Sequence, residues 1–346
     1  MKFLRFIFFP FAIIYWIITS IRNVFYQKGI MKSSKFSVPV INVGNLNMGG
    51  TGKTPHIEYL IRLLKDDYNV ATLSMCFDKK EREFIIKYKK KKKKKIGDEP
   101  LQFYKKYGNQ ITVCVEADRV LGTMDLFNAH PDINVLLLDD AFQHRKIHAG
   151  VNILLTDYND PYFKDFIIPV GNLRESRVGK KRADIVIVTK CPELNEAQKN
   201  NFIKRINPAN HQHVFFSKIN YGEVFDFRGN VVSIEGKNII LVTGIANADP
   251  LFQYLFSKAN ILKHFNFGDH HNFKPSQLEE IHNIFTKFAA QDPVIVTTEK
   301  DAMRLMSAQH QNSIKDYPWT YQSIEVQIDE KAAFDQLILD YVKKDN

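Results

Sequence analysis

The chain of 346 residues contains only three cysteines, Cys76, Cys114 and Cys191, and no two of them are close in the sequence. A disulfide framework and a structural zinc site both need cysteines at short, regular spacings. The spacing therefore argues against both. Isolated cysteines of this kind favour free thiols in a reducing compartment.

The sequence also lacks a general excess of basic residues. Lys and Arg total 48 and Asp and Glu total 38, a formal charge of +10, but seven of the lysines form one run, Lys89–Lys95. Leaving these seven out gives 41 basic residues against 38 acidic ones. A basic nucleic-acid-binding surface is therefore not predicted. The charges of these lysines repel one another, which indicates a solvated loop. The functional alternative is a loop that contacts anionic lipid headgroups.

One long uncharged segment lies at the N-terminus. Phe6–Ile21 contains sixteen uncharged residues between Arg5 and Arg22. A membrane-spanning helix needs about 20 apolar residues, so the segment is marginal for crossing a bilayer. Basic residues at both ends, together with Tyr15 and Trp16, favour a helix in the membrane interface. The alternatives are a buried first helix and a cleaved signal peptide, for which no small-residue cleavage site follows.

The remaining composition, 45% apolar and 25% charged, is that of a globular protein with room for two domains. Short apolar runs alternate with helical patterns from Ser37 onward, which is typical of a parallel sheet buried on both faces. The runs predict strands at 38–43, 70–73, 111–115, 135–138, 153–155 and 185–188, and a helix at 54–65. A hairpin is predicted at 225–232, turning at Gly229-Asn230. A second alternation predicts strands at 239–242, 261–267, 294–297 and 319–328.

The segment Gly44–Pro55, GNLNMGGTGKTP, lies between a predicted strand and a predicted helix. Its glycines allow backbone N–H groups to close around phosphate oxygens, and the N-terminus of the helix adds positive charge. The strict phosphate-loop pattern has glycine where this chain has Asn47, so the loop is a variant. The residues predicted to bind the nucleotide are Gly49, Gly50, Thr51, Gly52, Lys53 and Thr54.

Two residues of this loop have specific chemical roles. Lys53 is predicted to reach the β- and γ-phosphates of a nucleotide, and the Thr54 hydroxyl to bind Mg²⁺. The apolar run 134–138 ends in Asp139 and Asp140, which parallel pairing would bring beside the loop. At least one of these carboxylates is predicted to hold the Mg²⁺ complex; a helix cap by Asp140 is the alternative.

Seven short motifs occur in a fixed order along the chain. Each motif alone is weak evidence for a protein family, but the seven together are specific. They are GNLNMGGTGKTP (44–55), IGDEP (96–100), LLLDDAFQHR (136–145), PVGNLRE (169–175), TGIAN (243–247), FGDHHNF (267–273) and TTEKDAMRL (297–305). Together they resemble the tetraacyldisaccharide 4′-kinase family, the P-loop lipid A 4′-kinases of Gram-negative bacteria. The resemblance covers roughly residues 1–310.

The resemblance implies transfer of the γ-phosphate of ATP to the 4′-hydroxyl of a tetraacyldisaccharide 1-phosphate, forming lipid IVA, with Mg²⁺ as cofactor. Asp98 matches the family's base, and His270 or His271 could orient it; we favour His270. Arg174, in the family's Leu-Arg-Glu motif, matches a contact to the phosphate or the transition state. The implied acceptor-binding residues are Asn45, Arg119, Gln143, His144 and Glu175. Without the resemblance, Asp98 also reads as a helix cap and Arg174 as a surface ion pair.

Two segments leave alternatives open. Thr298-Glu-Lys-Asp301 fits nucleotide contact and a helix capping box equally well. Ser74–Lys80 departs from the family, which carries an arginine after the second strand where this chain has Met75. The arginine is a natural contact for the acceptor phosphate, so this contact is in doubt, and Lys79, Lys80 or the lysine run could replace it.

The predicted fold class is α/β, a P-loop NTPase-like parallel sheet with helices on both faces and a second, smaller α/β domain. The predicted divisions are a membrane-associated helix (1–30), a P-loop kinase domain (31–222), a hairpin linker (223–236) and a second domain closing over the nucleotide (237–346). The expected location is the cytoplasmic face of the inner membrane, in peripheral or monotopic form. Its expected partners are the lipid A precursor and the lipid surface, with no nucleic acid and no obligate protein.

Two other functions fit parts of the sequence. The GGTGKT core also resembles the loops of partitioning ATPases, so a membrane-bound NTPase switch is the main alternative. Those loops carry a second lysine at their start, where this chain has Asn47 and Met48. A nucleic-acid-dependent ATPase would rest on the lysine run alone, which has no interleaved aromatic residues.

Overall fold

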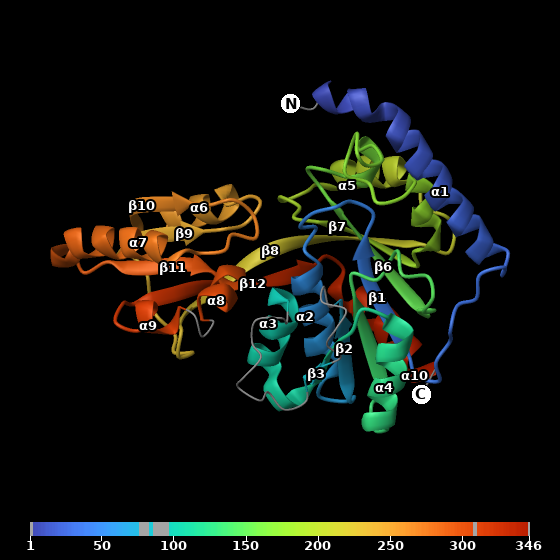
Figure 1. Cartoon of the computed structure of the whole chain (residues 1–346), viewed down its shortest axis with the longest axis horizontal. Coiled ribbons are helices and arrows are strands. Elements are labelled where there is room, and N and C mark those ends of the chain that lie inside the picture. The colour runs from blue at the N-terminus through green and yellow to red at the C-terminus, as the bar shows by residue number, and fades with distance from the viewer. Residues whose placement is uncertain (1–2, 76–82, 86–96, 307–309, 345–346) are drawn as a thin grey trace. The chain divides into compact units, whose positions relative to one another are not determined.

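The computed structural model describes residues 3–75, 83–85, 97–306 and 310–344. The chain divides into two compact units (Figure 1). The first unit contains Met1–Tyr88, Phe103–Ile219 and Val326–Asn346, and the second contains Lys89–Gln102 and Asn220–Glu325. Of the predicted features, Cys76–Lys80 and the lysine run Lys89–Lys95 lie outside the described residues.

The first unit is built on a sheet of almost entirely parallel strands in the order β8-β7-β6-β1-β5-β2-β4-β3. Within this order, β3 pairs antiparallel to its neighbour, β4, and the other pairs described are parallel. The strands are β1 (Val40–Asn45), β2 (Val70–Ser74), β3 (Glu83–Ile85), β4 (Thr112–Val115), β5 (Val135–Asp139), β6 (Val151–Asp157), β7 (Ile185–Thr189) and β8 (His213–Asp226). The central strand β1 is buried along its whole length, as expected of a parallel sheet covered on both faces.

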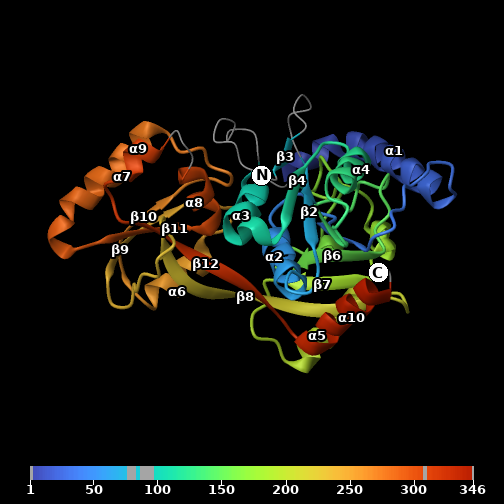
Figure 2. The same ribbon diagram turned by 90° about the horizontal axis from the view of Figure 1, so that it is seen from below.

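Helices cover both faces of this sheet. One face of the sheet carries the side chain of Val40, and α4 (Arg119–Ala129) covers this face next to β1. Helix α5 (Glu196–Ile206) covers the same face of the sheet at β6 and β7. The opposite face is covered by α2 (Lys53–Leu64) and α10 (Lys331–Lys344), which meet where Phe334 contacts Tyr59. Figure 2 shows α10 next to β8, and Phe334 packs there on Phe215. Helix α3 (Asp98–Tyr107) crosses the division between the units.

The second unit has its own parallel strands in the order β10-β9-β11-β12. These are β9 (Asn238–Thr243), β10 (Asn260–Asn266), β11 (Val294–Thr298) and β12 (Trp319–Ile328). The unit also contains α6 (Asp249–Phe256), α7 (Pro275–Lys287), α8 (Glu299–Leu305) and α9 (Gln311–Ile314). The chain enters this unit within β8 and leaves it within β12. Short 3₁₀ helices complete the structure: Phe3–Phe8, Gly108–Gln110, Tyr162–Lys164, Arg177–Arg182 and Ala289–Gln291.

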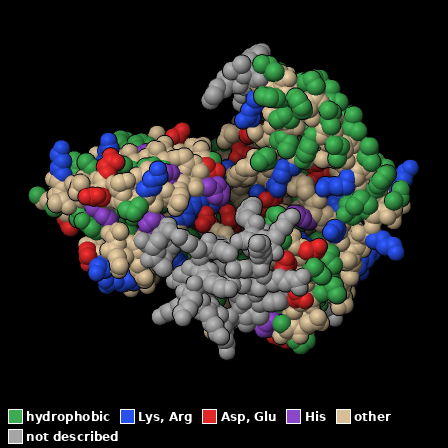
Figure 3. Space-filling view, viewed as in Figure 1, with side chains coloured by type: hydrophobic (Ala, Val, Ile, Leu, Met, Phe, Trp, Pro, Cys, Tyr) green, Lys and Arg blue, Asp and Glu red, His purple; other side chains and the backbone are tan. Residues whose placement is uncertain are grey.

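The N-terminal helix α1 (Phe9–Gln27) is apolar and mostly exposed. With the turn before it, it is long and apolar enough to cross a membrane, yet only Ala12 and Thr19 are buried. Its exposed side chains include Ile14 and Ile18, which are 55% and 60% accessible. Figure 3 shows apolar side chains gathered on the molecular surface along α1. A surface of this kind is what an interfacial helix presents to lipid.

Most predicted elements are confirmed. The strands of both alternations and the helix after the phosphate loop agree within a few residues with β1, β2, β4 to β7, β9 to β12 and α2. The hairpin is present: Phe225 pairs with Val231, and Gly229 has φ of +94° at the turn. The first part of β8 was not predicted.

The boundary predicted for the second domain is wrong at its C-terminal end. We expected 237–346 to form one domain, but Val326–Asn346 belongs to the first unit. The cause is long-range packing. Tyr341 bonds to the backbone of Val40, and the hydroxyl of Tyr59 donates to Asp335 at 2.6 Å. Likewise, residues 97–102 group with the second unit and not with the first.

Replacing Phe334 by alanine tests the place of α10. Its ring is 1% exposed, so the cavity left behind should lower the free energy of unfolding by about 3–5 kcal/mol. Urea denaturation of the purified protein measures this. Phe256→Ala removes the same atoms from a side chain that is 65% exposed and should cost far less. Equal effects of the two substitutions would contradict the packing described for α10.

The second unit should lose stability in mild acid because of His282. This buried ring stacks on Tyr317 at 3.6 Å and accepts a hydrogen bond from Trp319 Nε1 at 3.1 Å, and burial lowers its pKa to about 4. The unfolded chain protonates near pH 6.5, so His282 favours the folded state above that pH and this contribution disappears as the pH falls from 6.5 to 4.

The measurement is urea unfolding followed by the fluorescence of Trp319 in a Trp16→Phe background, at several pH values. His282→Phe should flatten the dependence of the midpoint on pH between 6.5 and 4. Its midpoint at neutral pH should also fall, because the Trp319 N–H loses its acceptor. An unchanged slope would show that His282 is not held neutral in the folded unit.

Candidate active site

The phosphate loop connects β1 to α2 and has the backbone that anion binding requires. Gly49 and Gly52 have φ of +123° and +87°, a conformation that favours glycine because a side chain would be strained there. Helix α2 begins directly after the second of them, at Lys53. Its free N–H groups and positive dipole end therefore face the loop, as at other phosphate sites.

A buried histidine that the sequence did not suggest supports this loop from behind. His56 Nδ1 contacts the carbonyl oxygen of Gly52 at 2.7 Å, and Nε2 contacts Ser217 Oγ at 3.0 Å. Burial lowers the pKa of His56 to about 4. The ring is therefore neutral at pH 7, with Nδ1 protonated so that it can donate to the Gly52 carbonyl.

Asp140 forms the charged centre of the first unit's site. Its backbone is left-handed, with φ of +52°. Its carboxylate lies 3.6 Å from Lys53 Nζ and 2.6 Å from Arg174 Nη2. Burial acts to raise the pKa of Asp140, but the charges of Lys53 and Arg174 outweigh it and hold the pKa below its usual value. Arg174 also donates to Asn45.

Asp139 and Arg119 lie on the inner side of the same strand end. The Asp139 carboxylate is buried and accepts from Ser74 Oγ at 3.2 Å. The guanidinium of Arg119 is also buried and donates to the carbonyl oxygens of Asp139 at 2.9 Å and Glu116 at 3.1 Å. In this arrangement Arg119 supports the end of β5, and its predicted contact with the acceptor stays a prediction.

Glu175 joins two of the other predicted acceptor residues, Gln143 and Asn45, into one network. Its fully buried carboxylate accepts from Arg182 at 2.6 Å, from Gln143 at 3.0 Å and from Asn23 of α1 at 2.8 Å. Gln143 also donates to the carbonyl oxygen of Asn45 at 2.9 Å. Glu175 is thus paired inside the protein, and its direct role is to position this network.

The neighbouring His144 is half-buried. Burial and the charge of Arg119 lower its pKa. An imidazole that stays neutral can accept or donate a hydrogen bond to a sugar hydroxyl. This is compatible with the acceptor contact predicted for it.

Lys190 is a further residue at the phosphate loop that sequence reasoning missed. It follows β7 with a left-handed backbone, φ of +56°. Its Nζ donates to the carbonyl oxygen of Gly50 at 2.5 Å and pairs with Asp157 at 2.8 Å. Next to it, Thr189 Oγ1 donates to the carbonyl oxygen of Thr51 at 2.9 Å. Their position in the sequence could have indicated this role, because both residues lie at the end of a parallel strand, at the sheet edge that carries the loop.

The second unit contains a separate cluster around Asp98. Its carboxylate lies 2.7 Å from Arg304 Nε and 3.9 Å from His270 Nδ1. His271 is directed elsewhere: it contacts Gln277 at 2.9 Å and stacks on Phe267 with ring centroids 4.4 Å apart. Of the two histidines, His270 is the one near Asp98, as we favoured.

The segment Thr298–Asp301 caps α8. Thr298 Oγ1 accepts from the Asp301 N–H at 3.1 Å and donates to Asp301 Oδ2 at 2.7 Å. Thr298 is therefore the N-cap of α8, but Asp301 Oδ2 accepts from the Thr298 hydroxyl and not from its N–H, so the pair differs from the predicted capping box. Nucleotide contact stays a prediction. Asp301 also accepts from the N–H of Gly244 at 2.8 Å, and burial raises its pKa. Beside it, Lys300 pairs with Glu99 at 3.1 Å.

Metal binding would have to use oxygen ligands from the phosphate loop and β5. Among the described residues, no group of three or more His, Cys, Asp or Glu side chains is arranged to hold a metal ion alone. A hydroxyl from Thr54 and a carboxylate from Asp139 or Asp140 are hard oxygen donors of the type that Mg²⁺ prefers, with phosphate oxygens and water completing its shell. The donor set therefore fits Mg²⁺ bound together with a nucleotide.

Comparison with known proteins identifies the family. Residues 4–343 match the family described as tetraacyldisaccharide-1-P 4′-kinase. A tetraacyldisaccharide 4′-kinase of Flavobacterium johnsoniae is 42% identical over 99% of both chains, and one of Bacteroides thetaiotaomicron is 38% identical over 97% of this chain and 93% of its own.

The fold also matches a solved structure. The crystal structure of LpxK from Aquifex aeolicus in complex with ATP aligns with a TM-score of 0.74 at 26% identity, covering 98% of this chain and 99% of that one. This match bears out the α/β fold class with its large, mostly parallel sheet. The chain belongs to the tetraacyldisaccharide 4′-kinase family.

Proposed function

We propose that this chain transfers the γ-phosphate of ATP to the 4′-hydroxyl of tetraacyldisaccharide 1-phosphate, forming lipid IVA. The observation that carries the proposal is the pairing of Asp140 with Lys53 and Arg174 at a phosphate loop, in a chain of this family. Two cations held by one carboxylate are suited to a ligand that carries several phosphate charges.

The nucleotide phosphates bind to the loop Gly49–Thr54 and the N-terminus of α2. Lys53 contacts the β- and γ-phosphates, and Thr54 holds Mg²⁺ together with Asp139 or Asp140. When bound, Mg²⁺ neutralises negative charge on the phosphate oxygens. Lys190 and His56 stiffen the loop through the carbonyl oxygens of Gly50 and Gly52.

The acceptor hydroxyl oxygen attacks the γ-phosphorus, the bond from that phosphorus to the β–γ bridging oxygen breaks, and ADP leaves. Asp98 accepts the hydroxyl proton, and His270 orients the carboxylate or tunes it. Arg174 contacts the transferred phosphoryl group. The acceptor is positioned by Asn45, Arg119, Gln143, His144 and Glu175, the last of these through the network it holds together.

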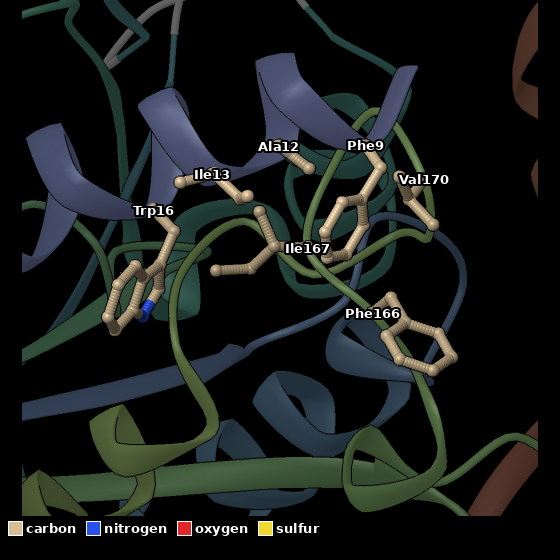
Figure 4. A pocket seen from close by; sticks show the side chains of 7 residues that line it. All are labelled: Phe9, Ala12, Ile13, Trp16, Phe166, Ile167 and Val170. Carbon is tan, nitrogen blue, oxygen red and sulfur yellow. The ribbon is translucent and has the colours of Figure 1, made fainter. Parts of the chain in front are cut away.

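The protein works at the cytoplasmic face of the inner membrane, with α1 in the lipid interface. The exposed apolar residues of α1 support this placement, because an acceptor with four acyl chains is met at a bilayer surface. Figure 4 shows an apolar pocket between α1 and residues 166–170, lined by Phe9, Ala12, Ile13, Trp16, Phe166, Ile167 and Val170. It has the chemistry to hold part of an acyl chain.

Transfer of labelled γ-phosphate from ATP to detergent-dispersed tetraacyldisaccharide 1-phosphate tests the proposal. Wild type should label the lipid. Asp98→Asn keeps the shape of the side chain but removes the base, and it should lower kcat by about 10²–10⁴-fold. Lys53→Ala should lower kcat by about 10²–10³-fold, because it removes a charge that stabilises the transition state.

The matched control is Asp316→Asn, an exposed carboxylate of the second unit, which should retain wild-type activity. Labelled lipid that is undiminished in Asp98→Asn would discard Asp98 as the base and keep the function. Free phosphate released at a useful rate, with no label in the lipid, would instead favour the NTPase switch.

The membrane proposal predicts weaker vesicle binding when charges enter α1. Each buried Ile contributes about 1.5–3 kcal/mol, so Ile14→Glu with Ile18→Glu should weaken binding to anionic phospholipid vesicles at least about tenfold. Vesicle co-sedimentation measures this. Val231→Glu, at an exposed apolar residue of the second unit, is the control. Equal binding by both variants would place the membrane contact outside α1.

A further inference from the structure

Arg304 is the closest charged neighbour described for the proposed base. From α8 it directs Nε to Asp98 Oδ2 at 2.7 Å, while the nearest nitrogen of His270 lies 3.9 Å from the same oxygen. At 2.7 Å the first contact has the length of a charge-assisted hydrogen bond, and at 3.9 Å the second does not. In this arrangement Arg304 holds the Asp98 carboxylate by a direct hydrogen bond, and His270 does not.

The other nitrogens of Arg304 are attached to a rigid part of the second unit. Nη1 donates to Asp301 Oδ1 at 2.8 Å and to the carbonyl oxygen of Gly244 at 3.2 Å. Asp301 is fully buried and is itself held by the N–H of Gly244 and by Thr298. The guanidinium is therefore clamped between the end of β9 and the start of α8, and its side chain is only 11% exposed.

Arg304 also constrains His270. Its Nη2 lies 3.3 Å from His270 Nδ1, and Lys300 Nζ lies 3.1 Å from Nε2 of the same ring. Arginine and lysine only donate, and a neutral imidazole has one nitrogen that can accept. Only one of these two contacts can therefore be a hydrogen bond at a time, and the base and its partner histidine share the same guanidinium.

We propose that Arg304 is a positioning residue for phosphoryl transfer, which holds Asp98 in the orientation that accepts the proton. The inference rests on the function proposed above. A surface ion pair would not need this geometry, since a single exposed charge serves equally well. Arg304 instead reaches Asp98, Asp301 and Gly244 through three separate donations, which the planar fork of arginine allows and a lysine cannot reproduce.

Steady-state kinetics with the full-length protein, ATP and the dispersed lipid acceptor test this role. Arg304→Ala should lower kcat at least tenfold while the KM for ATP stays within about twofold of wild type. Arg304→Lys should lie close to Arg304→Ala, since charge alone does not restore the fork. Adding guanidinium at millimolar concentration should recover part of the activity of Arg304→Ala and none of that of Asp98→Asn.

The control is Arg228→Ala, an exposed arginine at the hairpin of the same unit, which should behave as wild type with and without guanidinium. Wild-type kcat in Arg304→Ala would overturn the proposal. So would a loss of kcat that guanidinium does not relieve and that accompanies a lower melting temperature, because that pattern belongs to a structural role.

A measurement without acceptor separates this inference from the proposed function. Urea midpoints of Arg304→Ala, Asp98→Ala and the double variant should be non-additive, because each single change removes the same contact. Additive shifts of the urea midpoint would show that Asp98 and Arg304 are not in contact, whatever activity the variants have. Wild type that labels no lipid, with non-additive midpoints, would instead refute the proposed function and leave the contact established.

Discussion

The candidate site of the first unit depends on the ion pairs that the Asp140 carboxylate makes with Lys53 and Arg174. Lys53 and Arg174 approach the same point from different segments, and without an anion between them they would repel each other. Asp140 supplies that anion in the free protein. In the function proposed here, a nucleotide phosphate, with more negative charge and more acceptor oxygens, takes over both cations. In the free protein Asp140 holds these two cations in place.

This arrangement depends on strand register. Val43 of β1 lies opposite Asp139 of β5, and the Asp140 N–H donates to the Val43 carbonyl oxygen at 3.0 Å. Because side chains alternate along a strand, Asp139 turns inward to Ser74, while Asp140, with its left-handed backbone, turns toward Lys53. A slip of one residue would exchange the two carboxylates and bury the wrong one.

Patterns confined to short segments were predictable from the sequence. Apolar runs located the strands, and the glycines of the phosphate loop located the turn between β1 and α2. Contacts between distant segments were not: Tyr341 returning to Val40, and Arg304 lying 206 positions from Asp98, leave no local pattern. The two adjacent histidines show the same limit. The structure distinguishes them: His271 contacts Gln277 and stacks on Phe267, while His270 lies 3.9 Å from Asp98.

The consecutive residues Arg174 and Glu175 connect the apolar helix α1 to the phosphate loop. The carbonyl oxygen of Arg174 accepts from Tyr15 of α1 at 2.9 Å, while its guanidinium pairs with Asp140. Glu175 accepts from Asn23 of α1 and from Gln143, which also holds the backbone of Asn45. Because both links are buried or half-buried hydrogen bonds, α1 cannot shift without moving the side chains around the loop. In the function proposed here, the helix that meets the membrane and the side chains that meet the phosphate are therefore held as one structure.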